Sequence, residues 1–317
     1  VRLLENGLNS ADLLNILLIR CKLLAYSIYN ELGNNNLDCR QKFEVHALWI
    51  IEHFPGIDGF SELFIAIDHR ISSETYDSAR KKWIIHLAET PNNLAIMRNA
   101  ADFFSSSDPN TALGLYRKLQ ELNPDDPLWV VNQARLYDTM SVGTFQYSLT
   151  LSGEIKVKQL QESREFAEQA FNYMTKAVDL VNLKKDKLPY LCDLSLYAMC
   201  TSRFALAYQL ADEMIIMLNQ YHPDFYTQRA LFVSHLLAGL SECSRNFQSA
   251  KSHFALACNA IETRDFENAI DSSRATSMLK MLLLTGHLEN VVSTIRKNKE
   301  LAIDNPIREW IIDKTSE

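Results

Sequence analysis

Two stretches of the sequence decide the fold: ARKKWIIHLAETP at residues 79–91 and ALGLYRKLQELNP at residues 112–124. Aligned without a gap, each begins with alanine, has an aromatic residue at its fifth position and ends in proline. Apolar residues recur in both at three- and four-residue spacing, which is typical of an amphipathic helix. The proline ends the helix because it has no N–H for the next turn. The two stretches are therefore predicted to be equivalent helices of a repeat.

The helix predicted before the second stretch is repeated as well. Ala100 and Phe103 are matched 34 positions later by Ala134 and Tyr137. Alanine at a helix crossing lets two helices approach closely, and an aromatic ring fills the space toward the next unit. A fixed period of this length is typical of stacked helical arrays.

This pattern resembles the tetratricopeptide repeat, which has a period of 34 and combines a small residue, an aromatic, Ala-x3-Phe and a closing proline. The match is best over residues 75–140. The resemblance implies an all-α fold, a right-handed α-solenoid of helix-turn-helix pairs, in a single domain over residues 1–317. Over residues 155–300 the repeats are degenerate, since Ala250 and Phe254 keep the Ala-x3-aromatic element but several closing prolines are missing.

Amphipathic periodicity predicts seven helix pairs along the chain. Asp108 before Pro109, and Asp126 before Pro127, are typical helix starts, because the carboxylate accepts from a free backbone N–H and proline fits the first turn. The predicted pairs are 11–31 with 39–54, 61–71 with 75–89, 94–106 with 109–122, 127–140 with 155–182, 188–200 with 203–219, 224–240 with 246–262, and 265–284 with 287–300.

The segment TMSVGTFQYSLTLSG at residues 139–153 departs from this periodicity. Phe145, Tyr147, Leu149 and Leu151 alternate with other residues, a period of two that is typical of extended chain. The segment is predicted to be an insertion between the helices of the fourth pair, either a loop over the repeats or a short β-hairpin. It would be a plain surface connection, or a lid or flap that contacts a partner.

Composition excludes several classes of protein. Only 9 Gly and 8 Pro occur among 317 residues, too few for a turn-rich β fold. The net charge of −7 and the absence of a basic stripe argue against nucleic-acid binding. No run of 18 apolar residues occurs, so no membrane span is predicted. Six cysteines without a C-x-x-C pair predict free, mostly buried thiols and a reducing, cytoplasmic location.

The sequence has no specific catalytic or metal-binding motif. G-x-S-x-G, H-E-x-x-H and a Walker loop are all missing, and His46 and His53 lie seven residues apart instead of the four used on zinc helices. We therefore expect neither a cofactor, a metal ion nor enzymatic activity.

The candidate binding residues follow from the resemblance. The first helices of tetratricopeptide pairs line a concave groove, which implies that Arg98, Asn132 and Arg135 project into it. Some families of this repeat hold a peptide carboxylate there with a Lys/Arg/Asn clamp. Asn132 matches a clamp position, whereas Met97 and Ala101 do not. Arginine suits this role because its guanidinium pairs bidentately with carboxylates.

Two functions are compatible with these features. The resemblance implies an interaction scaffold that binds a peptide or partner protein in the groove through these three residues. The alternative is an enzyme or small-ligand sensor built on a helical array, with residues 139–153 as its lid. The three groove residues can also be plain solvated side chains.

Overall fold

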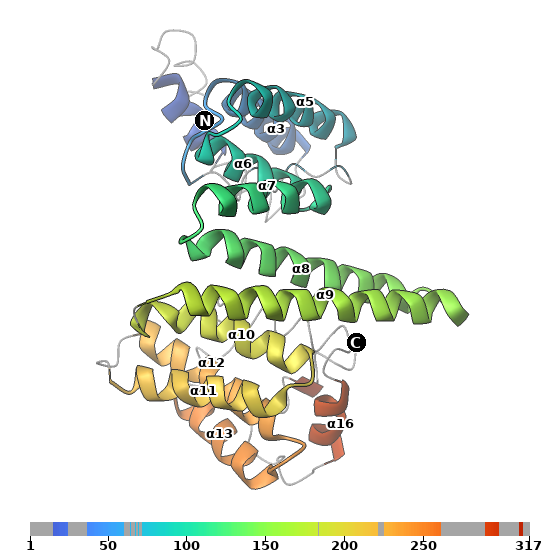
Figure 1. Cartoon of the computed structure of the whole chain (residues 1–317), viewed down its shortest axis with the longest axis vertical. Coiled ribbons are helices and arrows are strands. Elements are labelled where there is room, and N and C mark those ends of the chain that lie inside the picture. Colours follow the sequence, from blue (N-terminus) through green and yellow to red (C-terminus); the bar gives the residue numbers. More distant parts are fainter. Residues whose placement is uncertain are drawn as a thin grey trace. The chain divides into compact units, whose positions relative to one another are not determined.

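The structure is a computed structural model in which every regular element of the described residues is a helix (Figure 1). The prediction of an all-α fold is therefore confirmed. The residues that the structure describes are 15–24, 37–59, 64, 67, 69, 72–182, 184–220, 225–260, 289–297 and 311–312.

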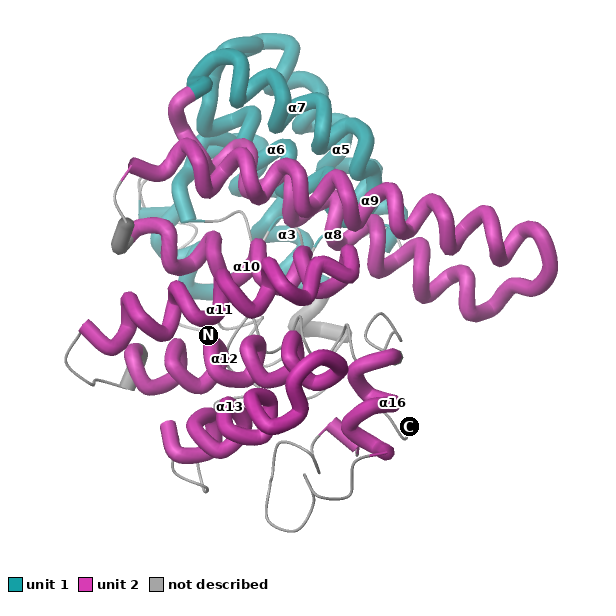
Figure 2. The backbone as a smooth tube through the Cα atoms, turned by 60° about the horizontal axis from the view of Figure 1, so that its bottom comes forward, with its two compact units in different colours: residues 1–124 teal, residues 125–317 magenta. Residues whose placement is uncertain are grey.

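The chain divides into two compact units, residues 1–124 and residues 125–317 (Figure 2). Each unit has a buried apolar core of its own. A single repeat domain over residues 1–317, with its helices arranged as a solenoid, stays a prediction.

Helices in unit 1 begin at short polar side chains. Ser72, Asn93 and Asp108 each accept a hydrogen bond from a backbone N–H in the first turn of the helix that follows. The helices are α3 (Leu37–His53), α5 (Ser73–Glu89), α6 (Leu94–Phe104) and α7 (Pro109–Leu122).

The two repeated stretches form equivalent helices, α5 and α7. Their alanines, Ala79 and Ala112, are fully buried, and their aromatic residues, Trp83 and Tyr116, are buried beside them. Each helix ends two residues before the proline that closes its stretch. The predicted correspondence between the two stretches is therefore found in the packing of unit 1.

Aromatic contacts fill the core of unit 1. Tyr76 of α5 stacks on Phe103 of α6 with ring centroids 5.0 Å apart, and Trp83 meets Phe64 edge to face at 5.2 Å. The hydroxyl of Tyr116 donates a hydrogen bond to the buried carboxylate of Asp102. Such ring pairs add to the stability that area burial alone supplies.

Unit 2 is a succession of helices in which each packs on its neighbour in sequence: α8 on α9, α9 on α10, α10 on α11, α11 on α12 and α12 on α13. Asp126 accepts from the backbone N–H of Leu128, as predicted for a helix start. The elements are α8 (Pro127–Leu149), α9 (Gly153–Leu180), the short 3-10 helix η1 (Lys184–Lys187), α10 (Leu188–Cys200), α11 (Phe204–Leu218), α12 (Phe225–Glu242), α13 (Phe247–Ala260) and α16 (Glu289–Lys297).

Most predicted helix pairs that fall on described residues are found. The pairs 94–106 with 109–122, 188–200 with 203–219 and 224–240 with 246–262 match α6–α7, α10–α11 and α12–α13 closely. The predicted helix 265–284 lies outside the described residues, as does most of the predicted helix 61–71.

The prediction for residues 139–153 is wrong. The chain continues as α8 to Leu149, turns over residues 150–152, and starts α9 at Gly153, whose φ of 63° suits glycine. Packing decides the outcome here, because Val142 and Ser148 are buried on the helix while Tyr147 is exposed. The apparent period of two comes from side chains distributed around an exposed helix end.

An arginine fork holds α9 against the turn between α10 and α11. Arg203 donates from both terminal nitrogens to the two carboxylate oxygens of Glu168, at 2.9 and 2.8 Å. The same guanidinium lies over the ring of Phe171, 4.3 Å from its centroid. Bidentate pairing and ring stacking together use the planar shape of the group.

Five of the six cysteines have a described side chain, and these five are free, as expected from their spacing: Cys21, Cys192, Cys200, Cys243 and Cys258. Cys243 is buried and the other four are half-buried, so the predicted burial is only partly found. Burial raises the pKa of the Cys243 thiol to about 12, and burial also raises the pKa of Cys192 and Cys200. These thiols are therefore held as unreactive S–H groups. Among the described helices, none is long and apolar enough to cross a membrane.

Candidate functional site

The predicted groove residue Arg98 lies on α6 in unit 1. Its guanidinium donates to Asp58 Oδ1 at 2.6 Å, and the Asp58 side chain is mostly exposed. Arg98 is therefore one half of a surface ion pair, and a ligand carboxylate at this position has to compete with Asp58.

The other two predicted residues, Asn132 and Arg135, lie on α8 in unit 2, one turn apart. The Nε and Nη2 atoms of Arg135 both donate to Asp193 Oδ2 on α10, at 3.1 and 3.0 Å. The Asp193 side chain is only 6% exposed. Arg135 therefore balances a buried carboxylate within its own unit, and Asn132 is half-buried beside it. A groove shared by Arg98, Asn132 and Arg135 stays a prediction.

The long hairpin of α8 and α9 offers a different surface. Its helices have 23 and 28 residues, more than any other helix described in the chain. In Figures 1 and 2 its far end extends beyond the other helices of unit 2. This projecting end, residues 143–160, is called the hairpin tip below.

Small polar side chains lock the two helices of the hairpin together. Ser141 Oγ donates to the carbonyl oxygen of Ser163, and Ser163 Oγ donates to the carbonyl oxygen of Ser141, both at 2.8 Å. Both serines are buried. These hydrogen bonds run between the two helices and satisfy both buried hydroxyl groups. They therefore hold α8 and α9 together at the base of the hairpin tip.

The hairpin tip exposes four large apolar side chains, distributed around its two helix ends. Tyr147 and Leu149 at the end of α8 are 58% and 55% exposed, and Ile155 and Val157 at the start of α9 are 63% and 67% exposed. Single exposed apolar residues are common on protein surfaces, but several close together mark interaction sites.

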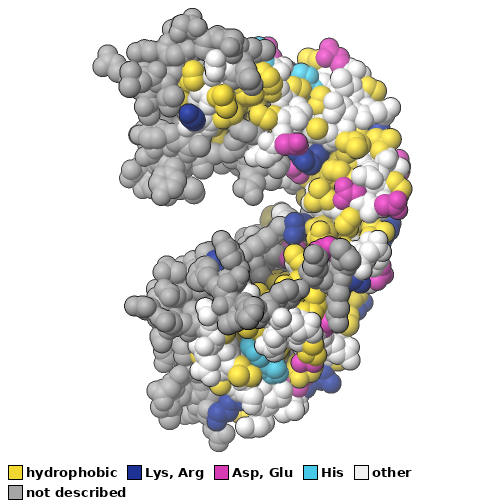
Figure 3. Space-filling view, turned by 90° about the vertical axis from the view of Figure 1, so that its left-hand side faces the viewer, with side chains coloured by type: hydrophobic (Ala, Val, Ile, Leu, Met, Phe, Trp, Pro, Cys, Tyr) yellow, Lys and Arg dark blue, Asp and Glu magenta, His cyan; other side chains and the backbone are white. Residues whose placement is uncertain are grey.

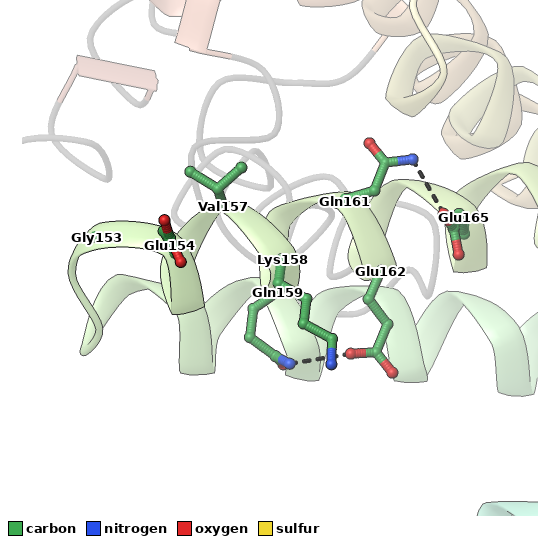
Figure 4. Close-up of a pocket in the computed structure, with 8 residues that line it drawn as sticks. All are labelled: Gly153, Glu154, Val157, Lys158, Gln159, Gln161, Glu162 and Glu165. Carbon is green, nitrogen blue, oxygen red and sulfur yellow. Dashed lines mark hydrogen bonds between the residues drawn. The ribbon is translucent and has the colours of Figure 1, made fainter.

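Polar side chains lie beside Val157 on α9 and form a polar rim. Gln159 donates to Glu162 and Gln161 to Glu165, each at 3.0 Å. In Figure 4 Val157 and Gln161 point to one side of α9, while Gln159 and Glu162 point to the other. These side chains line a shallow pocket together with Glu154. Of the four exposed apolar residues of the hairpin tip, Val157 lines this pocket, among polar side chains.

Two histidines form the other prominent polar contact of unit 2, and Figure 3 shows histidine side chains at one face of this unit. His235 of α12 and His253 of α13 face each other with their Nδ1 atoms 3.1 Å apart. Burial and the charge of His253 lower the pKa of His235 to about 4, and burial lowers the pKa of His253. The carboxylates that oppose these shifts are Asp212 of α11 for both rings and Glu242 of α12 for His253.

This pair makes unit 2 sensitive to acid. Unfolded histidine takes up its proton near pH 6.5, whereas folded His235 stays neutral down to about pH 4. The unfolded chain therefore binds more protons between these values, so the stability present above pH 6.5 is lost as the pH falls toward 4. We expect the urea midpoint to be lower at pH 5.0 than at pH 7.5, and His235→Gln to reduce this difference. His69→Gln, at an exposed histidine, is the control. If the difference between the two urea midpoints is as large in His235→Gln as in His69→Gln, the acid sensitivity does not come from His235.

A search for metal-binding groups covers the described part of the chain. There, no group of three or more His, Cys, Asp or Glu side chains is placed to hold a metal ion. The hairpin tip offers noncovalent contacts, through its exposed apolar side chains and the hydrogen-bonded amides and carboxylates beside them.

No protein-family model matches the chain, and a comparison with curated proteins finds no match.

Proposed function

We propose that this protein is a helical-repeat scaffold that binds a partner protein, and that the hairpin tip is its docking surface. The observation that carries the proposal is the exposure of four large apolar side chains at one projecting end of a hairpin, Tyr147, Leu149, Ile155 and Val157, each more than half exposed. Burying such side chains against a partner removes apolar surface from water, which is the main favourable term in association.

An amphipathic helix of the partner is the occupant that suits this surface. The rim charges Glu154, Lys158 and Glu162 alternate in sign at four-residue spacing along α9. That spacing is the repeat of one helix face, so a second helix lying along this face, beside Val157, can pair its acids and bases with those of α9. The serine contacts at the base keep the surface rigid, which reduces the entropy lost on binding.

The groove implied by the tetratricopeptide resemblance is the alternative docking surface for the same function. Its two arginines already have acidic partners, Asp58 and Asp193. A peptide carboxylate gains less binding free energy from a guanidinium that must first break its ion pair with another carboxylate. This is why the hairpin tip is favoured over Arg98, Asn132 and Arg135.

A photo-cross-linking amino acid in the full chain tests where the partner docks. Placed at position 157 it should form a protein adduct, and placed at Ile216, an exposed residue of α11, it should not. The adduct at position 157 should disappear when Ile155→Asp is added to the same chain. Equal adducts at both positions, or an adduct that survives Ile155→Asp, would overturn the hairpin tip as the surface.

A further inference from the structure

Two histidine nitrogens face each other where three helices of unit 2 meet. The Nδ1 atoms of His235 on α12 and His253 on α13 lie 3.1 Å apart, and the centroids of the two rings lie 5.4 Å apart. On α11, the ring of Tyr208 meets the His253 ring edge to face at 5.7 Å. Because α12 packs on both α11 and α13, the histidine pair lies at the junction of these three helices.

The distance between the two nitrogens suits two ligands of one metal ion. A zinc–imidazole bond is about 2.0–2.1 Å long, so two such bonds that meet at about 90–109° place their nitrogens ~2.9–3.4 Å apart. The observed 3.1 Å lies within this range. Before an ion binds, one Nδ1–H group donates to the other Nδ1 atom, and this hydrogen bond keeps the two rings together. Imidazole nitrogen is a preferred ligand of zinc, copper and nickel ions.

The surroundings of the pair suit a cation that arrives from solvent. Both rings are half-buried, and Figure 3 shows histidine side chains at the surface of unit 2. Asp212 lies four residues after Tyr208, on the same face of α11. Burial lowers the pKa of both histidines, and the carboxylate of Asp212 opposes this lowering at each ring. A negative charge that acts on both rings also favours a positive ion between them.

We propose that His235 and His253 bind a divalent transition-metal ion through their Nδ1 atoms, with Asp212 balancing its charge and water completing its coordination. Two protein ligands are fewer than the four of a structural zinc site, so the ion is expected to exchange readily. It would tie α12 to α13. The two histidines are 18 residues apart, which is why no metal-binding motif is seen in the sequence. The inference is independent of the proposed docking function.

The test titrates Zn²⁺ into the full chain after treatment with a chelator, with the thiols kept reduced. The readout is the NMR signals of the histidine Cε1–H groups, labelled with carbon-13 and assigned by His235→Gln, His253→Gln and His69→Gln. Zn²⁺ at micromolar concentration should shift the signals of His235 and His253 together, in a saturable way. The signal of the exposed His69 should stay unmoved. Mg²⁺ should shift none of them, because it prefers oxygen ligands.

Variants then test each ligand. His253→Gln should weaken the effect of Zn²⁺ on the His235 signal at least tenfold, and Asp212→Asn should weaken zinc binding about tenfold. Glu213→Gln, at the neighbouring acid of α11, is the matched control and should change nothing. Circular dichroism checks that each variant is folded.

The proposal is overturned if Zn²⁺ leaves both signals unmoved in the unchanged chain, or if Mg²⁺ shifts them as Zn²⁺ does. It is equally overturned if the His235 signal responds to Zn²⁺ in His253→Gln as it does in the wild type, because the ion would then bind elsewhere. Equal zinc affinity in Asp212→Asn and Glu213→Gln would remove Asp212 from the site.

Discussion

Replacing Arg135 by alanine is expected to destabilise unit 2 by about 3 kcal/mol. The substitution removes both hydrogen bonds to Asp193 Oδ2 and leaves a carboxylate that is 6% exposed without its cation. Breaking a buried ion pair by removing one partner is costly because the remaining charge stays desolvated. Urea denaturation at pH 7.5 measures the loss.

A second arginine of the chain provides the control. Arg98→Ala breaks an ion pair whose acid, Asp58, is largely exposed, so the loss should stay below about 1 kcal/mol. Adding Asp193→Asn to Arg135→Ala should recover part of the stability, because it removes the unpaired charge. Equal losses for Arg135→Ala and Arg98→Ala would show that the Asp193 pair does not stabilise unit 2.

Replacing Gly239 by alanine is expected to disrupt the packing of α12 on α13, at a cost of about 2–3 kcal/mol. A Cβ atom at Gly239 would lie 2.5 Å from Cε1 and 2.7 Å from Cδ1 of Phe254. The Phe254 ring is almost fully buried, so it cannot move aside without displacing its neighbours. A lower urea midpoint with unchanged helical circular dichroism in the folded state is the expected result.

Gly143 is the matched control, because a Cβ atom there has no neighbour within 4 Å and the residue lies in the exposed part of α8. Gly143→Ala should raise the stability by about 0.5–1 kcal/mol, since alanine favours a helix. A loss of stability at Gly143 would instead support a loop or hairpin over residues 139–153. No loss at Gly239 would contradict the close approach of α12 and Phe254.

Local signals in the sequence predicted the helices well. Residues 79–91 and 112–124 share an alanine, an aromatic residue and a proline. These mark equivalent helices because the alanine and the aromatic residue pack in the same way in both. Asp108 and Asp126 mark helix starts because a cap is satisfied within one turn of chain. These signals concern neighbours in sequence, which is why they can be interpreted without the fold.

Contacts between distant residues could not be predicted in the same way. Asp193 lies 58 residues after Arg135, and nothing near Arg135 indicates that its charge is used internally. The alternation of Tyr147 and Leu149 suggested extended chain, whereas burial of Ser141 against Ser163 fixes a helical hairpin instead. The sequence did draw attention to the 139–153 segment as a possible partner contact, but with the wrong secondary structure.

The affinity of the full chain for the partner cross-linked at position 157 tests the central claim most directly. Two chains are compared with the wild type: Ile155→Asp with Val157→Asp at the hairpin tip, and Ile84→Asp with Ile85→Asp at two similarly exposed positions of α5. Each aliphatic side chain buried on binding contributes ~1–2 kcal/mol, and 1.4 kcal/mol corresponds to a tenfold change in the dissociation constant. The tip variant should therefore bind at least tenfold more weakly, while the α5 variant should bind as the wild type does. Unchanged affinity for the tip variant, together with a loss in Asn132→Ala, would contradict the claim and place the partner in the groove.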